Sequence, residues 1–330
     1  MIESFVSATD IPREWDDAIG DNIYLKRDFL SFMERVNACR QRYYMIRGNG
    51  DPDTVFVTYV LGGYNLAMFT RFRLLVEMTF VYVPLSVTRP GIAFGERLGE
   101  ALDFIKKIKG YKIILNLGKY PFPGFARGYT CPKCILAIAW RAFDEYLGSL
   151  RSGYRHRCLK AIRKSESLRM RFLSDGGEFN DQMYSLYLQV YDHSETKIEK
   201  LSKGFFEGRF FRIFVLERDS RAHGFVQLLE NGDELIFEFV GFDYATNEDY
   251  DTYMRMLLEI VRYGIEHGFK TIDFGQTADE TKLRLGSEYA YLYAYLHHSN
   301  AFVNFLCGLL APCLEYRPIA TRFSVFKERI

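Results

Sequence analysis

The sequence lacks a charge excess, a disulfide-like cysteine pattern and a leader segment. Its 43 lysines and arginines nearly balance its 42 aspartates and glutamates, so the net charge of +1 gives no overall attraction to nucleic acids or membranes. Any site for a polyanion must therefore be a local patch. The six cysteines have no disulfide-framework spacing, and the first residues lack the basic and apolar segments of a signal peptide. These absences predict a protein of the reducing cytoplasm.

Several catalytic motifs are also missing. The sequence contains no Gly-x-Ser-x-Gly, no P-loop and no His-Glu-x-x-His, so readings as a hydrolase, nucleotidase or metalloprotease have no support. Cys131 and Cys134 form a single Cys-x-x-Cys pair, and a zinc site would need two further ligands. Cys307, Cys313, His297 and His298 are no more than candidates for them. We therefore expect no metal.

The sequence does have ample material for buried cores. Hydrophobic residues make up 48% and aromatic residues 16% of the chain, which excludes a disordered protein. A length of 330 residues suits two domains of ordinary size.

One stretch carries the clearest structural pattern. Asn231-Gly232 between apolar runs is a strong hairpin signal, and an amphipathic helix and a strand follow. The pattern predicts an antiparallel meander, a crossover helix that ends at Gly268, and a returning strand. The expected strands are Phe211–Glu217, His223–Leu229, Glu234–Gly241 and Lys270–Phe274, and the apolar helix positions are Met254, Leu257, Leu258, Val261 and Ile265.

This order resembles the core of the GNAT acyltransferases. Asp273-Phe274-Gly275, followed by Lys282 and by Gly286 four residues later, resembles the C-terminal signature of the Fem-type branch, which includes aminoacyl-tRNA-dependent peptidoglycan-peptide transferases. Two further segments are similar to the same branch: Ala142 to Leu147 ahead of a basic helix over about 143–166, and Trp15-Asp16 ahead of Asp28-Phe29-Leu30. The resemblance implies an α/β (α+β) fold with two tandem GNAT-like domains, each a mixed, mainly antiparallel sheet with flanking helices. We place them at 1–140 and 141–330.

A degenerate internal repeat supports this duplication. Gly110-Tyr111-Lys112 and Gly268-Phe269-Lys270 each follow an amphipathic helix and begin a strand. The alternative is a chance match, because glycine often ends a helix ahead of a strand.

The resemblance also implies a chemistry, in which an amine attacks an activated acyl or aminoacyl carbonyl directly. In GNAT folds the strand before the crossover helix splays from the strand after it, which places the backbone N–H groups of Phe239, Val240 and Gly241 near the carbonyl oxygen. Glu238 interrupts an apolar run, and partial burial would raise its pKa toward that of a general base. The alternative is that Glu238 faces solvent or binds a cross-strand arginine.

Lys282 matches a family lysine that holds negative charge near the donor, although it could also be a surface lysine on a loop. Basic and polar residues could bind the phosphates of a donor, although several arginines on a helix could equally form a solvated face. Tyrosines near the returning strand could line the acceptor pocket, with core or edge packing as the alternative. The donor-binding candidates are Arg151, Arg155, Arg163, Gln276 and Arg284, and the acceptor-pocket candidates are Tyr253, Tyr289 and Tyr291.

The GNAT glycine loop that binds the pyrophosphate of coenzyme A is absent. Residues 241–251 carry four carboxylates in its place, and these would repel a pyrophosphate. We expect no tightly bound cofactor, and a co-substrate that is aminoacyl-tRNA, an acyl-carrier protein or acyl-CoA. The acceptor would be a small-molecule or peptide amine. There are two rival interpretations. The protein could be an acyltransferase that binds acyl-CoA in an unusual manner, or a non-catalytic GNAT-fold ligand-binding protein.

The apolar segment 301–314 differs from the rest of the chain. It contains Asn304, Gly308 and Pro312 and is shorter than the ~20 residues that span a bilayer, so we expect no transmembrane segment there. A packed terminal helix is the simplest reading. The alternative is peripheral contact with a membrane or a partner.

Overall fold

The computed structural model describes residues 2–194, 200–319 and 323–328. The chain forms two compact units. The first comprises Met1–Pro132 and Tyr291–Pro318, and the second comprises Lys133–Ala290 and Ile319–Ile330.

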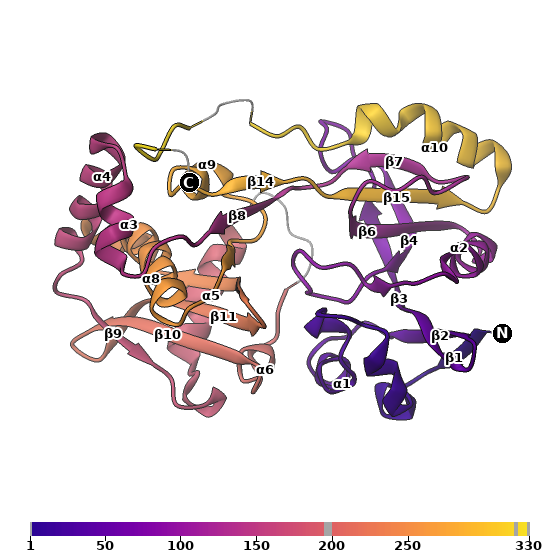
Figure 1. Cartoon of the computed structure of the whole chain (residues 1–330), viewed down its shortest axis with the longest axis horizontal. Helices are drawn as coiled ribbons and strands as arrows, with labels where there is room; N and C mark the ends of the chain where they lie inside the picture. The colour runs from indigo at the N-terminus through magenta and orange to yellow at the C-terminus, as the bar shows by residue number, and fades with distance from the viewer. Residues whose placement is uncertain (1, 195–199, 320–322, 329–330) are drawn as a thin grey trace. The chain divides into compact units, whose positions relative to one another are not determined.

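The first unit is built on a mixed sheet with the strand order β1-β2-β3-β4-β6-β15-β7, and β5 pairs with β3 (Figure 1). Its strands are β1 (Ile2–Phe5), β2 (Arg42–Gly48), β3 (Asp51–Asn65), β4 (Leu75–Val81), β5 (Ile92–Ala93), β6 (Tyr111–Leu117), β7 (Ala126–Tyr129) and β15 (Tyr293–His298). Its helices are α1 (Arg27–Val36), α2 (Leu98–Lys107) and α10 (Ala301–Leu314), with short 3-10 turns at Ala8–Asp10, Arg13–Asp17 and Ile23–Leu25.

Two apolar clusters cover this sheet. Ala101, Leu102 and Ile105 of α2 pack with Ile114 of β6 in one cluster. Cys307 of α10 packs with residues of β3, β4, β6 and β15 in the other. Within the described ranges, no helix has both the length and the apolar character needed to cross a bilayer.

The second unit has a sheet with the strand order β14-β8-β13-β12-β11-β10-β9. Its strands are β8 (Lys133–Ala137), β9 (Arg169–Phe172), β10 (Phe211–Arg218), β11 (Arg221–Asn231), β12 (Glu234–Phe242), β13 (Thr271–Asp273) and β14 (Glu288–Ala290). Its helices are α3 (Phe143–Ser149), α4 (Ser152–Lys164), α5 (Asp181–His193), α6 (Lys203–Phe206), α7 (Tyr244–Tyr250), α8 (Thr252–Glu266) and α9 (Asp279–Leu283), with a 3-10 turn at Gly176–Glu178.

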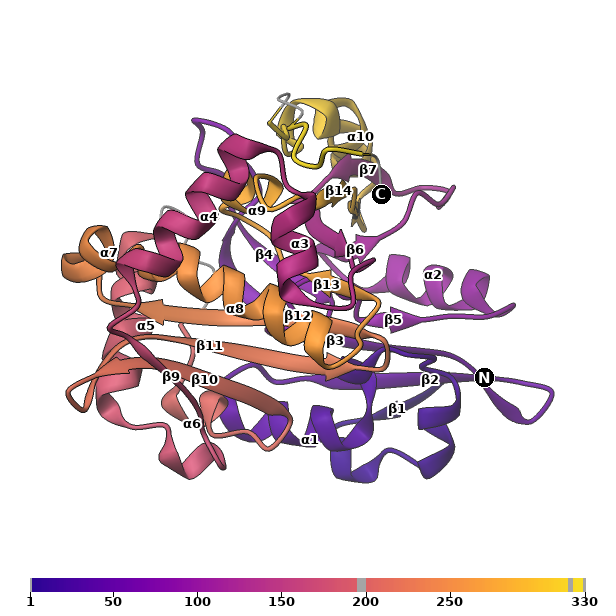
Figure 2. The ribbon, with the colours of Figure 1, turned by 60° about the vertical axis from the view of Figure 1, so that its left-hand side comes forward.

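Helices cover both faces of the second sheet. Residues of α3, α4 and α8 share one apolar cluster with Leu228 of β11 and Leu235 of β12. On the other face, Phe205 and Phe206 of α6 contact the ring of Phe239 on β12. Figure 2 shows α8 lying along β11 and β12.

The two units repeat one topology, which confirms the predicted tandem fold. In the first, an antiparallel meander β2-β3-β4 is followed by α2 and by β6, which pairs in parallel with β4. In the second, β10-β11-β12 is followed by α8 and by β13, which pairs in parallel with β12. Gly110 and Gly268 both take left-handed conformations, with φ of 82° and 74°, ahead of the returning strands. Glycine makes this conformation accessible at each helix end.

The second strand after each repeat joins the sheet of the other unit, whereas the first, β7 or β14, stays in the sheet of its own unit. β8 follows the first repeat but pairs antiparallel with β13, and β15 follows the second repeat but pairs antiparallel with β6. The structure therefore divides the chain between Pro132 and Lys133 rather than after residue 140, and assigns 291–318 to the first unit.

The single basic helix expected over about 143–166 is two helices. The break lies at Leu150, which has extended backbone angles and forms a β-bridge with Phe326. The N–H of Arg151 donates to the carbonyl of Val325. Contact with the chain end therefore replaces helical hydrogen bonds at this point.

Candidate active site

The strands β12 and β13 separate soon after they meet. Their parallel pairing covers Glu234 with Thr271, Leu235 with Ile272, and Ile236 with Asp273. Because β12 continues to Phe242, its residues 237–242 extend beyond this pairing. We call the point after Ile236, where β12 continues without β13 beside it, the splay; Phe239, Val240 and Gly241, the residues that the family resemblance implies, follow this point on β12.

Glu238 lies at a β-bulge two residues after the last parallel pair. Phe237 pairs with Leu228 and Phe239 pairs with Gln227, which leaves Glu238 as the extra residue on β12. A bulge bends the strand and changes the direction of its side chains. The side chain of Glu238 is buried, so it does not face solvent.

Gly241 allows α5 to approach β12 closely. A Cβ atom at this position would lie 2.3 Å from Cε1 of Phe225 and 2.6 Å from the backbone nitrogen of Tyr187. Backbone atoms cannot move aside as a flexible side chain can. The helix α5 therefore packs on the backbone of β12 beside the splay.

A tight turn after β13 brings α9 back to the splay. The carboxylate of Asp273 accepts a hydrogen bond from the N–H of Gly275 at 2.8 Å. Thr277 and Ala278 then both adopt left-handed conformations, with φ of 63° and 49°. Such conformations are uncommon outside glycine and often occur at functional sites.

Lys282 is a buried residue of α9, not the surface loop lysine considered as an alternative. Its side chain is only 3% exposed. Its ammonium donates to the carbonyl oxygen of Gln276 at 2.8 Å and lies 5.8 Å from the ring centroid of Phe237. The fold therefore places this cation against β12 at the residue where the splay begins.

Burial lowers the pKa of Lys282 from 10.5 to about 8. Loss of solvation is the main cause, and electrostatic interaction with Cys134, Asp279 and Asp273 acts in the opposite direction. Burial also raises the pKa of the Cys134 thiol to about 12. At neutral pH the lysine is therefore mostly protonated beside a neutral thiol.

The two carboxylates near Lys282 have hydrogen-bond partners within the protein. Asp273 accepts a hydrogen bond from the ammonium of Lys133 at 3.0 Å. Asp279 accepts one from the phenol of Tyr289 at 2.9 Å. Burial, together with the nearby Cys134, Tyr244 and Asp279, raises the pKa of Tyr253, so this phenol stays neutral. We call the following residues the Lys282 cluster: Cys134, Tyr253, Asp273, Asp279, Lys282 and Tyr289.

The other predicted site residues are dispersed. The guanidinium of Arg284 binds Glu280 at 2.6 Å and lies 4.6 Å from the ring centroid of Phe323. Tyr291 belongs to the first unit, where its ring contacts Tyr129, so it lies in a different unit from Tyr253 and Tyr289.

Three of the predicted donor-binding arginines are exposed on α4 or at its start. Arg151 donates to the carbonyl of Phe326 at 2.9 Å. Arg155 and Arg163 form no ion pair with any residue in 2–194, 200–319 or 323–328. The structure therefore leaves two of them available for a phosphate-bearing donor.

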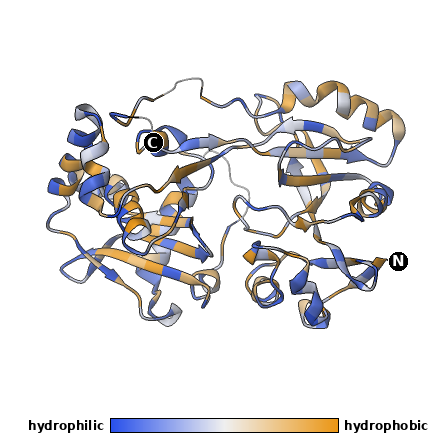
Figure 3. Cartoon of the chain, in the orientation of Figure 1, coloured by the Kyte–Doolittle hydropathy of each residue, from blue (hydrophilic) through white to orange (hydrophobic). Residues whose placement is uncertain are grey.

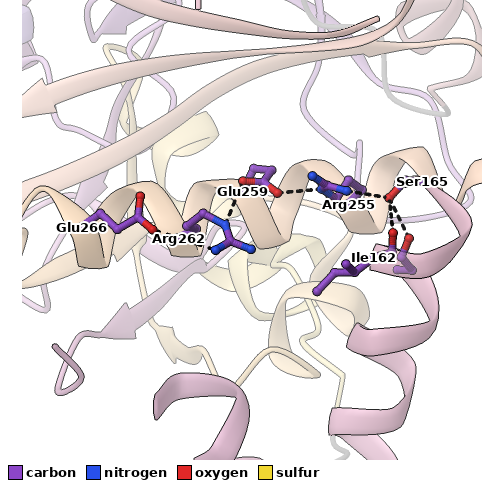
Figure 4. Close-up of polar contacts among 7 residues, drawn as sticks. Ile162, Ser165, Arg255, Glu259, Arg262 and Glu266 are labelled. Carbon is purple, nitrogen blue, oxygen red and sulfur yellow. Dashed lines mark hydrogen bonds and ion pairs between the residues drawn. The ribbon is translucent and has the colours of Figure 1, made fainter. Parts of the chain in front are cut away.

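A polar network holds α4 against the crossover helix α8 (Figure 4). Glu259, which is buried, pairs with Arg255 at 2.6 Å and Arg262 at 3.2 Å. Arg255 also donates to Ser165 at the end of α4 at 3.0 Å. A buried carboxylate with two charged donors is well compensated for its lost hydration. The network therefore positions the basic helix relative to the strand pair that forms the splay.

The usual pyrophosphate position is occupied by internal contacts. Asp243 is buried, accepts a hydrogen bond from the N–H of Ala245 at 3.0 Å and binds Arg221 at 2.6 Å. At the start of α8, the N–H of Tyr253 donates to the side-chain oxygen of Asn247 at 3.0 Å. The side chains of Asp243 and Asn247 therefore already form hydrogen bonds within the protein in the segment where a GNAT glycine loop would bind a pyrophosphate.

Sequence reasoning missed the roles of Cys134 and Asp279. The sequence analysis considered Cys134 only with Cys131 as an incomplete zinc pair, and the structure places the two cysteines in different units. Within the described parts of the chain, no three His, Cys, Asp or Glu side chains are arranged to hold a metal ion. The available signal was spacing, because Asp279 lies three residues before Lys282, on the same side of a helix.

Comparison with protein families supplies a match for the second unit. Residues 152–283 match the model of the acetyltransferase (GNAT) domain. A search of curated protein sequences finds no match.

Solved structures share the fold across both units. FemX has a TM-score of 0.53 and 11% identity, covering 83% of this chain and 92% of that chain. L-PGS from Bacillus licheniformis has a TM-score of 0.54 and 9% identity, covering 86% and 90%. A conserved protein of unknown function from Bacteroides thetaiotaomicron has a TM-score of 0.58 and 9% identity, covering 90% and 100%. At these identities the likeness establishes the fold.

Proposed function

Because this chain belongs to the GNAT superfamily of acyltransferases and has the fold of its Fem-like branch, we propose that it is an N-acyltransferase acting by direct attack. An amine acceptor attacks the carbonyl carbon of an activated acyl or aminoacyl donor, and no covalent enzyme intermediate forms. The donor is an aminoacyl-tRNA or a carrier-bound or CoA thioester.

The observation that carries this proposal is the buried cation beside the strand splay. Lys282 lies against Phe237, and Glu238 follows at the bulge. A cation held in a water-poor site stabilises developing negative charge more strongly than one in solvent. The arrangement supports one position for the donor carbonyl and its leaving group.

In this mechanism the backbone N–H groups along Phe239, Val240 and Gly241 polarise the carbonyl. The ammonium of Lys282 stabilises negative charge on the oxyanion or on the departing alkoxide or thiolate. Glu238 accepts the proton of the attacking amine, directly or through a water. Lys282 donates its hydrogen bond to the carbonyl oxygen of Gln276, not to Glu238. Lys282 and Glu238 therefore have separate roles in this mechanism.

The basic helix α4 would bind the donor. Exposed Arg155 and Arg163 on α4 suit phosphates of tRNA or of a carrier's phosphopantetheine. The polar contacts at the start of α8 disfavour the usual binding mode of CoA pyrophosphate. Donors that bring phosphates to α4 are therefore preferred over free acetyl-CoA.

A donor comparison tests the function. We expect transfer of a labelled group from a charged tRNA pool or an acyl-carrier protein to an amine mixture, and weak binding of free acetyl-CoA by calorimetry. Micromolar acetyl-CoA affinity, with phosphates at residues 247–249, would contradict the donor assignment. A ligand detected by native mass spectrometry, with no transfer from any donor, would instead indicate a non-catalytic binding protein.

Glu238→Gln tests the general base. We expect a rate loss on the order of 100-fold at the low end of the pH range, where the amine is protonated, and a smaller loss at high pH. The measurement is the pH profile of kcat/KM. Glu230→Gln is the matched control, because Glu230 binds the phenol of Tyr263 at 2.6 Å on β11. Equal profiles for parent and Glu238→Gln would remove Glu238 from this role.

A further inference from the structure

The first unit has an apolar surface that its own fold does not cover. None of the fourteen residues of α10 is charged. Phe302, Phe305 and Leu309 are 69%, 66% and 64% exposed and follow the i, i+3, i+7 spacing of one helix face. Cys307 is the buried residue of the helix, and it packs toward the sheet. The helix therefore leaves three bulky apolar side chains exposed on one face, and Figure 3 shows its apolar character.

A second exposed apolar element belongs to the same unit. The loop between β3 and β4 contains Phe72, which is 78% exposed. The side chain of Asn65 accepts hydrogen bonds from the N–H groups of Ala67 at 3.2 Å and Leu74 at 2.9 Å, which fixes the shape of the loop.

The loop is joined to the chain that follows α10. The ring of Phe69 meets that of Tyr316, two residues beyond the helix, with their centroids 5.3 Å apart. We call these exposed apolar residues of the first unit, Phe72, Phe302, Phe305 and Leu309, the α10 surface. Exposed apolar residues scattered singly are normal on proteins, whereas three of these four share one helix face.

Arginines accompany the apolar residues. Arg71 and Arg73 flank Phe72, and Arg317 follows Tyr316; all three are exposed. None of them forms an ion pair within the parts of the chain that the structure describes. Their guanidinium groups are therefore available to bind an anionic partner such as a phosphate.

We propose that the α10 surface docks the protein on a bilayer surface that contains anionic phospholipid. Aromatic and leucine side chains enter the boundary between headgroups and acyl chains, while the arginines bind lipid phosphates. Fourteen residues rise about 21 Å along a helix axis, less than the ~30 Å of a hydrocarbon core, so α10 lies along the surface.

Charge favours a lipid partner over a second copy of the chain. In a symmetric dimer the same patch lies on both sides of the interface. Two copies joined through the α10 surface would bring the arginines of one near the arginines of the other, and like charges oppose association. An anionic lipid surface satisfies both the apolar and the basic groups. This inference does not depend on the chemistry of the second unit.

Vesicle flotation tests the proposal with the full chain. We expect binding to phosphatidylcholine vesicles that contain phosphatidylglycerol, weaker binding to phosphatidylcholine alone, and loss of binding with added salt. Near an anionic surface each arginine contributes roughly fivefold in partitioning, so Arg71→Gln with Arg73→Gln should reduce it about 25-fold.

The apolar contribution has its own variants. Phe302→Ser, Phe305→Ser and Leu309→Ser together should abolish flotation. Val6→Ser is the matched control, because Val6 is 67% exposed in the same unit but outside the α10 surface. Thermal melting checks that each variant is folded. If the triple variant is not folded, Phe305→Ser alone should still reduce binding.

Two results would overturn the proposal. In the first, the parent fails to float with phosphatidylglycerol-containing vesicles. In the second, vesicle binding is unchanged by the serine and glutamine substitutions. If sedimentation shows a dimer that the serine variants dissociate, and flotation is absent, the α10 surface is instead a contact between copies of the chain.

Discussion

Replacing Lys282 by methionine is expected to lower turnover by about 100-fold or more while leaving the second unit folded. The ammonium is held in a buried position against Phe237, where a charge contact used in the transition state contributes a few kcal/mol. Methionine keeps most of the length of the side chain, whereas alanine would leave a larger cavity in the core. The measurement is kcat with the donor identified by the transfer assay, and circular dichroism reports the fold.

The same substitution should change how stability depends on pH. The pKa of Lys282 is about 8 in the folded protein and 10.5 when solvated, so between these values the unfolded chain binds more protons. The stability of the parent should therefore rise with pH across this window, and its turnover should fall above about pH 8 as the ammonium is lost. Lys282→Met should remove the stability rise, which denaturant titrations at several pH values would measure. Near-parental turnover in this variant would show that the site is assigned wrongly.

Gly241→Ala is expected to lower the free energy of unfolding by about 3 kcal/mol, the upper range for overpacking. The new methyl group would meet Cε1 of Phe225 at 2.3 Å and the nitrogen of Tyr187 at 2.6 Å, so α5 must move away from β12. Urea denaturation measures the loss, and a lower rate should accompany it because Gly241 borders the splay.

Gly148→Ala is the control for Gly241→Ala. Gly148 lies in α3 of the same unit, and a Cβ atom there meets nothing within 4 Å. A helical glycine in open space should be replaced by alanine at no cost or with a small gain. Equal stability of the Gly241 and Gly148 variants would mean that α5 does not pack on β12 as described.

The meander and its crossover helix could be predicted because their signals are local. Asn231-Gly232 ends β11, and Gly232 has the positive φ of 60° that such a turn requires. Leu257, Leu258 and Val261 follow helical spacing and are all buried in α8. Each of these features depends on neighbours within a few residues.

The strand exchange and the burial of Lys282 could not be predicted in the same way. β8 finds its partner β13 more than a hundred residues later, and nothing within β8 specifies that pairing. The short helix α9 carries Asp279 and Lys282 into the core, and their compensation depends on Tyr289 and Gln276. From the sequence alone, a lysine with charged residues nearby is predicted to be exposed, because its hydrogen-bond partners in the folded protein are not known.

The exchanged strands also set the order in which the sheets can be completed during synthesis. All strands of the second unit lie between β8 and β14, in one continuous stretch of chain. In the first unit β15 lies between β6 and β7. The pairing of these two strands with β15 can therefore form only after Tyr293–His298 has emerged from the ribosome. The later repeat can therefore finish its sheet before the earlier one. During that interval β6 keeps an open edge, the kind of surface that chaperones protect in nascent chains.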